Sequence, residues 1–372
     1  MHKVLLIFGT RPEAIKLCPV IRVLREHPSR FHVRVCVTAQ HREMLDQVLE
    51  AFQVQPDYDL DLMTPGQTLF SSTSRILAGL EPVMKTESPD LVIVQGDTTT
   101  TLCGSLAAFY ANVPLAHVEA GLRTGDLRQP FPEEMNRVVT SRLADLHFAA
   151  TAKAAENLRS EGVRAERICV TGNTGIDAVL YVRDGLQQGL LQGREWPEID
   201  SNKKLVVVTA HRRESFGGGF ERICRALAKL ADRADVQVIY PVHPNPNVQD
   251  PVNRLLAGHR NIRLIDPLSY VPFVDLMRRA YLLITDSGGI QEEGPSLGKP
   301  ILVMREKTER PEAVAAGTVK LVGTDEKRIL EEAEILLENA EIYNRMSRIH
   351  NPYGDGRAST RIADVIHSFL GR

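Results

Sequence analysis

The sequence predicts an α/β fold made of two doubly wound domains, and three features of the chain predict it. Short apolar strands alternate with amphipathic helices from end to end, which is typical of parallel sheets covered by helices on both faces. The chain has 372 residues, more than the roughly 250–300 at which a single hydrophobic core stops growing. The strand pattern is interrupted once, in the polar stretch at residues 184–204.

The strands and helices can be placed in order from the apolar periodicity. Strands are expected at residues 4–8, 33–38, 91–95, 115–119, 146–149 and 168–171, and then at 205–209, 236–241, 262–265, 282–285, 301–304 and 319–321. Helical patterns include residues 14–26, 42–52, 69–85, 220–234 and 328–339. We therefore expect a first domain over residues 1–171, a second over 172–356 with a ligand cleft between them, and a last helical segment at 357–372.

The amino-acid composition limits which partners and which cellular compartment are expected for this protein. Hydrophobic residues make up 43% and charged residues 25%, with a net charge of −2, so neither nucleic acid nor an anionic membrane is an expected partner. The five cysteines are scattered and mostly within apolar runs, which favours buried thiols in a reducing compartment. The apolar runs are shorter than a membrane span requires. We expect a cytoplasmic protein.

The most informative stretch is Thr-Asp-Ser-Gly-Gly-Ile-Gln-Glu-Glu-Gly at residues 285–294. It places Ser287, Gly288 and Gly289 at the start of a helix that directly follows a strand, where backbone N–H groups attract a phosphate. Glu293 follows one helical turn later, and its carboxylate could accept hydrogen bonds from the two hydroxyls of a ribose. The ordinary alternative is a strand-to-helix turn capped by Ser287.

Charged residues also follow strands in the first half of the chain. Arg11 and Lys16 stand at the start of a helix and could bind phosphate, or they are exposed helix cations. Asp97 opens a helix, where an aspartate is often only an N-cap. Glu133 and Arg137 share one helix face, and their ordinary alternative is an i,i+4 ion pair. Glu119 ends a strand just before a glycine-rich loop. Ligands bind at the carboxyl ends of strands in open α/β sheets, so this concentration of charge predicts an enzyme cleft.

Redox and metal chemistry are not expected. His211 follows a strand and precedes three glycines, where it could act on a leaving phosphate. The dinucleotide pattern Gly-x-Gly-x-x-Gly and the phosphate-loop lysine motif do not occur. The histidines at 41, 117, 211 and 243 lack ligand spacing. The sequence therefore predicts phosphate-binding amides, cations and carboxylates, without a cofactor or a metal.

Several long strings carry a specific resemblance. They are Phe-Gly-Thr-Arg-Pro-Glu-Ala-Ile-Lys at 8–16, Thr-Ala-Gln-His-Arg at 38–42, Thr-Glu-Arg-Pro-Glu at 308–312, Asn-Pro-Tyr-Gly-Asp-Gly at 351–356, and the segments 96–101, 117–126 and 285–299. With these strings the chain resembles the non-hydrolysing UDP-N-acetylglucosamine 2-epimerases nearly end to end. The resemblance implies two Rossmann-like domains of the glycosyltransferase-B type facing a cleft, with the last helix crossing back to the first domain. It also implies a cytoplasmic homodimer that interconverts UDP-N-acetylglucosamine and UDP-N-acetylmannosamine.

The resemblance assigns roles to individual residues. It implies acid–base roles for Asp97, Glu119 and Glu133, with His211 close to the diphosphate. Contacts to the UDP-sugar are implied for Arg11, Lys16, Phe273, Ser287, Gly288, Gly289, Glu293 and Arg310, and Arg137 is taken as a further substrate-binding residue. A regulatory site for a second UDP-N-acetylglucosamine is implied by Gln40, Glu43, Arg212 and His243.

Two positions depart from the family pattern. Leu268 stands where some relatives place a glutamine near the uracil, and Gly66 stands where some carry an arginine that helps to hold the regulatory sugar nucleotide. These departures put the polar contact to uracil and the regulation by substrate in question.

Chemistry limits the route of epimerisation. The C2 proton is not next to a carbonyl, so enolisation cannot remove it, and oxidation at a neighbouring carbon would need a nicotinamide site that the sequence lacks. The remaining route is loss of UDP with removal of the C2 proton, which gives 2-acetamidoglucal. This route needs carboxylates and stabilisation of the leaving UDP. The alternatives are a UDP-sugar-dependent glycosyltransferase and a non-catalytic sugar-nucleotide sensor.

Overall fold

The computed structural model describes residues 1–38, 42–62, 64 and 66–371. It divides the chain into two compact units, unit 1 with Met1–Ala178 and Tyr353–Arg372, and unit 2 with Val179–Pro352. These breaks differ from the boundaries expected after residues 171 and 356. The first break lies inside one continuous helix, α7 (Thr174–Gln187). The second comes earlier because the carbonyl of Tyr353 already accepts a hydrogen bond from the N–H of Asn173 at 2.7 Å, within unit 1.

Unit 1 is a seven-stranded sheet with the strand order β3-β2-β1-β4-β5-β6-β7. Its strands pair in parallel, and β1 and β4 carry apolar residues that are wholly buried, such as Val4 and Val92. The strands are β1 (His2–Phe8), β2 (Phe31–Val37), β3 (Tyr58–Asp59), β4 (Leu91–Gln95), β5 (Leu115–Ala120), β6 (Leu146–Ala149) and β7 (Ile168–Val170). Besides α7, the helices are α1 (Arg11–Arg25), α2 (Arg42–Ala51), α3 (Leu69–Glu87), α4 (Thr99–Tyr110), α5 (Glu133–Leu143), α6 (Ala152–Ser160) and α15 (Ala358–Leu370).

Unit 2 is a six-stranded parallel sheet with the order β10-β9-β8-β11-β12-β13. Its strands are β8 (Lys204–Thr209), β9 (Val236–Pro241), β10 (Ile262–Ile265), β11 (Leu282–Thr285), β12 (Ile301–Val303) and β13 (Val319–Leu321). The helices are α8 (Gly218–Ala231), α9 (Pro246–Leu256), α10 (Tyr270–Arg279), α11 (Gly288–Glu293), α12 (Pro311–Ala316), α13 (Glu326–Glu338) and α14 (Ala340–Ser347). The expected α/β class with two doubly wound sheets is confirmed, and β3 is a strand that the periodicity missed.

The strand orders show where ligands can bind. In each sheet the order reverses direction at one place, between β1 and β4 in unit 1 and between β8 and β11 in unit 2. Loops that leave the carboxyl ends of such neighbouring strands diverge to opposite faces, which opens a crevice at the sheet edge. The loops that begin at Gly9 and Gly96, and those at His211 and Asp286, are therefore the places to look for a site.

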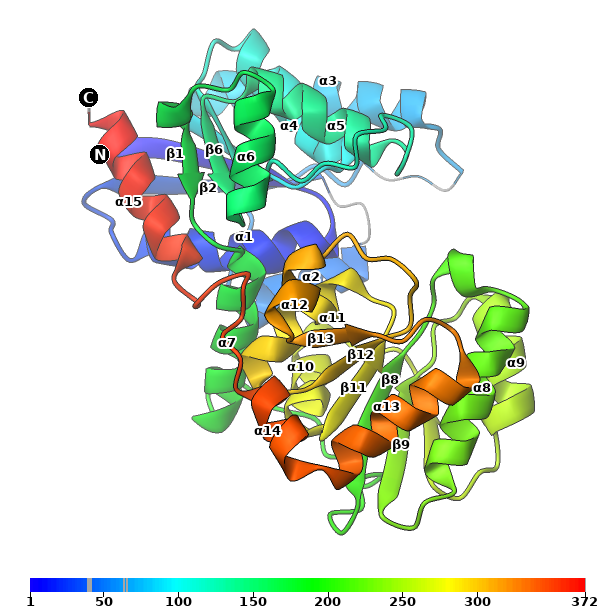
Figure 1. Ribbon diagram of the computed structural model, residues 1–372. Helices are drawn as coiled ribbons and strands as arrows, with labels where there is room; N and C mark the ends of the chain where they lie inside the picture. Colours follow the sequence, from blue (N-terminus) through cyan, green and yellow to red (C-terminus); the bar gives the residue numbers. More distant parts are fainter. Residues whose placement is uncertain (39–41, 63, 65, 372) are drawn as a thin grey trace. The chain divides into compact units, whose positions relative to one another are not determined.

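Helix α15 packs on α1 within unit 1, as Figure 1 shows. Its buried face includes Ile362 and Ile366, both fully buried. The helix start is capped by a side chain from α7, because the Asp177 carboxylate accepts hydrogen bonds from the N–H groups of Ser359 at 2.7 Å and Ala358 at 3.2 Å. Asp177 thus satisfies two of the backbone donors that a helix start leaves unpaired. Among the described residues, the helices lack the combined length and apolar character needed to cross a membrane.

The cap on α15 predicts a measurable loss of stability. Asp177→Ala should lower the free energy of unfolding by about 1 kcal/mol, the usual cost of losing a helix cap. Thermal unfolding followed by circular dichroism measures it, with Asp364→Ala on the exposed face of the same helix as the control. Equal melting temperatures for the two variants would contradict the capping role.

Candidate active site

A buried carboxylate ties together the two loops at the crevice of unit 1. Glu13 on α1 is 1% exposed. Its Oε2 accepts hydrogen bonds from the N–H groups of Gly9 at 3.0 Å and Thr10 at 2.7 Å, both in the loop after β1. Its Oε1 accepts hydrogen bonds from the hydroxyls of Thr98 at 2.6 Å and Thr101 at 3.1 Å, at the start of α4. Burial raises the pKa of Glu13, and hydrogen bonds from Thr98, Thr10 and the N–H of Gly9 oppose the rise.

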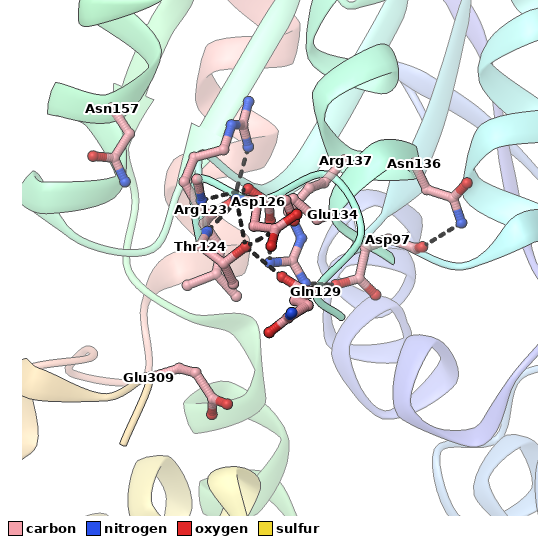
Figure 2. Close-up of polar contacts among 12 residues, drawn as sticks. Asp97, Arg123, Thr124, Asp126, Gln129, Glu134, Asn136, Arg137, Asn157 and Glu309 are labelled. Carbon is pink, nitrogen blue, oxygen red and sulfur yellow. Dashed lines mark hydrogen bonds and ion pairs between the residues drawn. The ribbon is translucent and has the colours of Figure 1, made fainter. Parts of the chain in front are cut away.

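Asp97 lies in the turn between β4 and α4, but it is not the N-cap of α4. That position belongs to Thr98, whose side chain accepts a hydrogen bond from the N–H of Thr101. The carboxylate of Asp97 instead accepts a hydrogen bond from Arg137 Nη2, and its backbone carbonyl accepts one from Asn136 Nδ2 at 2.8 Å (Figure 2). Asp97 is thus held by α5 and stays partly accessible, with 29% of its side chain exposed.

The partners of Arg137 differ from the ion pair considered in the sequence analysis. The ordinary alternative was an i,i+4 ion pair with Glu133, but the guanidinium bonds Glu134 at 2.9 Å and Asp97 instead. Glu133 is half-buried at the first position of α5. Glu133 thus lies on the same helix as the residues that hold Asp97. Its acid–base role stays a prediction.

Glu119 is held between two side chains at the end of β5. It forms an ion pair with Lys16 Nζ at 2.5 Å and accepts a hydrogen bond from Gln95 Nε2. Its φ of +65° is rare for a residue with a side chain, and the pairing register of β5 with β6 shifts at this point. Such backbone strain is found where a side chain has to be aimed. A Cβ on Gly96 would lie 3.9 Å from Glu119 Oε2, so this carboxylate lies beside the turn that carries Asp97.

His117 supports the same turn from inside the sheet. It is fully buried on β5, and its Nε2–H donates to the carbonyl of Gly96 at 2.7 Å. Burial lowers the pKa of His117 to about 3, so the ring is neutral at physiological pH. Arg11 stands half-buried at the start of α1, beside the loop that Glu13 holds.

In unit 2 a second buried carboxylate connects neighbouring strand ends. Asp286, after β11, is fully buried, and its Oδ2 accepts hydrogen bonds from the N–H groups of His211 at 2.6 Å and Arg212 at 2.7 Å. The His211 ring lies 3.3 Å from Asp286 Oδ1 and stacks on His243, with 5.5 Å between ring centroids. Burial lowers the pKa of His211, while Asp286 opposes the shift. Asp286 was not among the predicted site residues.

Two arginines of unit 2 lie over the start of α11. A Cβ placed on Gly288 would meet guanidinium nitrogens of Arg310 at 3.6 Å and Arg212 at 3.9 Å. Arg310 also donates to Glu292. Ser287 occupies the N-cap position of α11, but its side chain makes no capping hydrogen bond. The ordinary alternative of a serine-capped turn is therefore wrong, and backbone N–H groups with two cations make this a suitable place for a diphosphate.

The remaining predicted residues can be placed more briefly. Gly289 and Glu293 are on α11, and Phe273 is half-buried on α10. Of the regulatory candidates, Arg212 and His243 lie in unit 2, close to Gly288 and His211 respectively. Gln40 lies outside the described residues, and the structure describes the backbone of Glu43 on α2 but not its side chain.

Sequence reasoning missed the residues that hold the predicted ones in place. These are Glu13, Gln95, Glu134, Asn136 and Asp286. Most are polar residues inside or beside apolar runs, and that signal could have marked them, because a buried polar side chain needs partners. Within the described part of the chain, groups of three or more His, Cys, Asp or Glu arranged to hold a metal ion are not found.

Comparison with known proteins gives the family. The UDP-N-acetylglucosamine 2-epimerase family matches residues 22–367. The chain belongs to this family. UDP-N-acetylglucosamine 2-epimerase of Escherichia coli (strain K12) is 58% identical over 369 residues, which cover 98% of each chain.

Solved structures agree with this assignment. The crystal structure of UDP-GlcNAc 2-epimerase from Neisseria meningitidis bound to UDP-GlcNAc matches with a TM-score of 0.89 and 48% identity, covering 100% of both chains. The structure of the glycotransferase of kitacinnamycin matches with a TM-score of 0.65, 12% identity and 99% coverage of each chain, a likeness of fold alone.

The buried His117 predicts a pH dependence of stability. An unfolded histidine takes up a proton below about pH 6.5, whereas folded His117 does so only near pH 3. Between these values the unfolded chain binds more protons, so the free energy of unfolding should fall as the pH falls. In denaturant titrations His117→Gln should show a shallower fall from pH 6.5 to 4 than the wild type. His32→Gln, at an exposed position, should keep the wild-type slope; an unchanged slope for His117→Gln would refute the assignment.

Proposed function

We propose that this protein interconverts UDP-N-acetylglucosamine and UDP-N-acetylmannosamine. The observation that carries the proposal is the pair of carboxylates at neighbouring strand ends of unit 1, Asp97 and Glu119, each bonded to a cation. Family membership supports the same conclusion, since the relatives named above are UDP-N-acetylglucosamine 2-epimerases.

The proposed reaction is an elimination followed by an addition. A carboxylate takes the proton from C2, the bond between C1 and the UDP oxygen breaks, and 2-acetamidoglucal forms with a double bond between C1 and C2. A proton then adds to C2 from the opposite face while the UDP oxygen bonds C1 again. The overall change is inversion at C2, and the chemistry needs two acid–base groups and stabilisation of the departing UDP.

Residue roles follow from chemistry and position. We assign the acid–base work to Asp97, Glu119 and Glu133, which resemble the family's acidic residues in sequence. Contacts to UDP go to the start of α11 and to Arg310, where N–H groups and guanidinium donors suit a diphosphate. His211 is the candidate for stabilising the leaving group, because Asp286 holds its backbone N–H and lies 3.3 Å from its ring nitrogen Nδ1. Arg11, Lys16, Arg137, Phe273 and Glu293 are assigned to substrate binding.

A glycosyltransferase is the second candidate, because a glycosyltransferase structure shares the fold. The two functions differ in what they need. A glycosyltransferase consumes its donor only with an acceptor, whereas an epimerase needs the sugar nucleotide alone.

The direct test is incubation of the purified protein with UDP-N-acetylglucosamine alone, followed by proton NMR. We expect the signals of UDP-N-acetylmannosamine to appear until the two sugars reach a constant ratio, and the same ratio to be reached from the other sugar. An unchanged substrate spectrum at high enzyme concentration would refute the proposed function.

Amide variants test the acid–base residues. An amide keeps the size and polarity of a carboxylate but cannot accept a proton. Asp97→Asn, Glu119→Gln and Glu133→Gln should each be made, and at least two should lose about 10²-fold or more in kcat, the usual scale of general acid–base catalysis. UDP affinity, measured by calorimetry, should stay close to that of the wild type. Near-normal turnover in all three variants would place the chemistry elsewhere.

We further propose that the protein works as a homodimer in the cytoplasm. The cysteines at positions 18, 36, 103, 169 and 224 are free thiols, which suits a reducing compartment. Phe109 and Tyr110 on α4 are 61% and 69% exposed, and exposed aromatic side chains of this kind are common at protein interfaces. Light scattering after gel filtration should give twice the chain mass of 41.4 kDa. A monomer mass over the working concentration range would refute the dimer.

A further inference from the structure

Glu134 on α5 is a buried carboxylate to which neither the sequence motifs nor the proposed function gives a role. It is 1% exposed. Its Oε1 accepts hydrogen bonds from the N–H groups of Thr124 at 2.9 Å and Gly125 at 3.1 Å, and its Oε2 accepts one from Arg137 Nη1 at 2.9 Å. Figure 2 shows Glu134 with Thr124 and Arg137 close to it. Both carboxylate oxygens therefore accept hydrogen bonds: Oε1 bonds the backbone of the loop, and Oε2 bonds Arg137.

Arg137 connects Glu134 to Asp97, because it donates hydrogen bonds to both carboxylates. Its guanidinium bonds Glu134 through Nη1 and Asp97 through Nη2. The Arg137 side chain is only 8% exposed. A planar guanidinium bonded at two nitrogens cannot turn without breaking one bond, so Glu134 fixes the direction from which Arg137 meets Asp97.

The two other contacts of Glu134 fix a loop. Thr124 and Gly125 belong to the segment that follows β5, close in sequence to Glu119, and Gly125 has a φ of +84°. Their N–H groups both point at Glu134 Oε1. One side chain therefore sets the start of this loop and the orientation of the arginine on Asp97.

We propose that Glu134 is a positioning residue for Asp97, acting through Arg137. This inference rests on the proposed function, because it gives Glu134 a role in that reaction. Because Glu134 is only 1% exposed, its effect on the reaction would come through Arg137. Without it, Arg137 keeps one carboxylate partner in a buried place and is free to reorient around Asp97, so the Asp97 carboxylate loses its fixed direction. A displacement of about 1 Å in a catalytic group can cost about 10²-fold in rate.

Glu134→Gln tests the proposal, because the amide keeps the shape but offers one acceptor oxygen where two are needed. We expect kcat for epimerisation to fall about 10- to 100-fold, with UDP affinity close to the wild type. Glu161→Gln is the matched control. Glu161 accepts two hydrogen bonds from Arg123, at 2.7 Å and 3.0 Å, in the same unit. It should keep kcat within about two-fold.

A double-mutant cycle separates positioning from a general effect on the fold. If Glu134 acts through Asp97, then Glu134→Gln should cause no further loss in an Asp97→Asn background, because the group that it positions is already disabled. Losses that multiply in the double variant would overturn the proposal. So would wild-type kcat in the single variant.

A second variant covers the case in which Glu134→Gln does not fold. Glu134→Asp keeps the charge but is one methylene shorter, so it can reach the loop or Arg137 but not both. We expect a kcat below the wild type with UDP affinity retained, and wild-type kcat would overturn the proposal. An inactive wild-type protein would instead refute the proposed function, so the two failures can be told apart.

Discussion

Each sheet depends on a buried carboxylate at the place where its strand order reverses. Glu13 holds the loop after β1 against the start of α4, and Asp286 holds the loop after β8 at the end of β11. An ionised carboxylate without partners would be very costly to bury. Here Glu13 has four donors and Asp286 has the N–H groups of His211 and Arg212. Because neighbouring parallel strands otherwise send their loops apart, these two side chains bring the functional residues together within each unit.

In unit 1 ion pairs with cationic side chains orient two carboxylates at these fixed loops. Lys16 pairs with Glu119, and Arg137 pairs with Asp97. Both pairs remain partly accessible, as a group that exchanges protons with a substrate must be. The cations hold the carboxylates in place before substrate arrives, and such preorganisation is a main source of enzymatic rate enhancement. Helix α5 contributes most of the contacts to Asp97. It carries Asn136, which donates to the Asp97 carbonyl, and the Glu134–Arg137 pair, and it also carries Glu133.

The sequence predicts the class of fold and most residues of the candidate site, and the reasons are specific. Apolar strands such as residues 91–95 are unambiguous because both faces of a parallel sheet are buried. Asp97 and Glu119 could be found because they stand at the carboxyl ends of such strands. Glu134 could not be ranked, since a glutamate among charged neighbours looks like a surface residue. The roles of such residues depend on partners far along the chain, for example Thr98 and Thr101 for Glu13, and spacing in sequence does not reveal these pairings. The short strand β3 was missed because two residues carry no period.

In the proposed reaction a proton leaves C2 of the sugar, and a proton returns to C2 from side chains that exchange with the solvent. Proton NMR of the epimerisation in heavy water tests it most directly. We predict that the UDP-N-acetylmannosamine formed by the wild-type protein carries deuterium at C2, because an acid–base carboxylate exchanges its proton with the solvent before the return step. Product formed with the original hydrogen fully retained at C2 would contradict it.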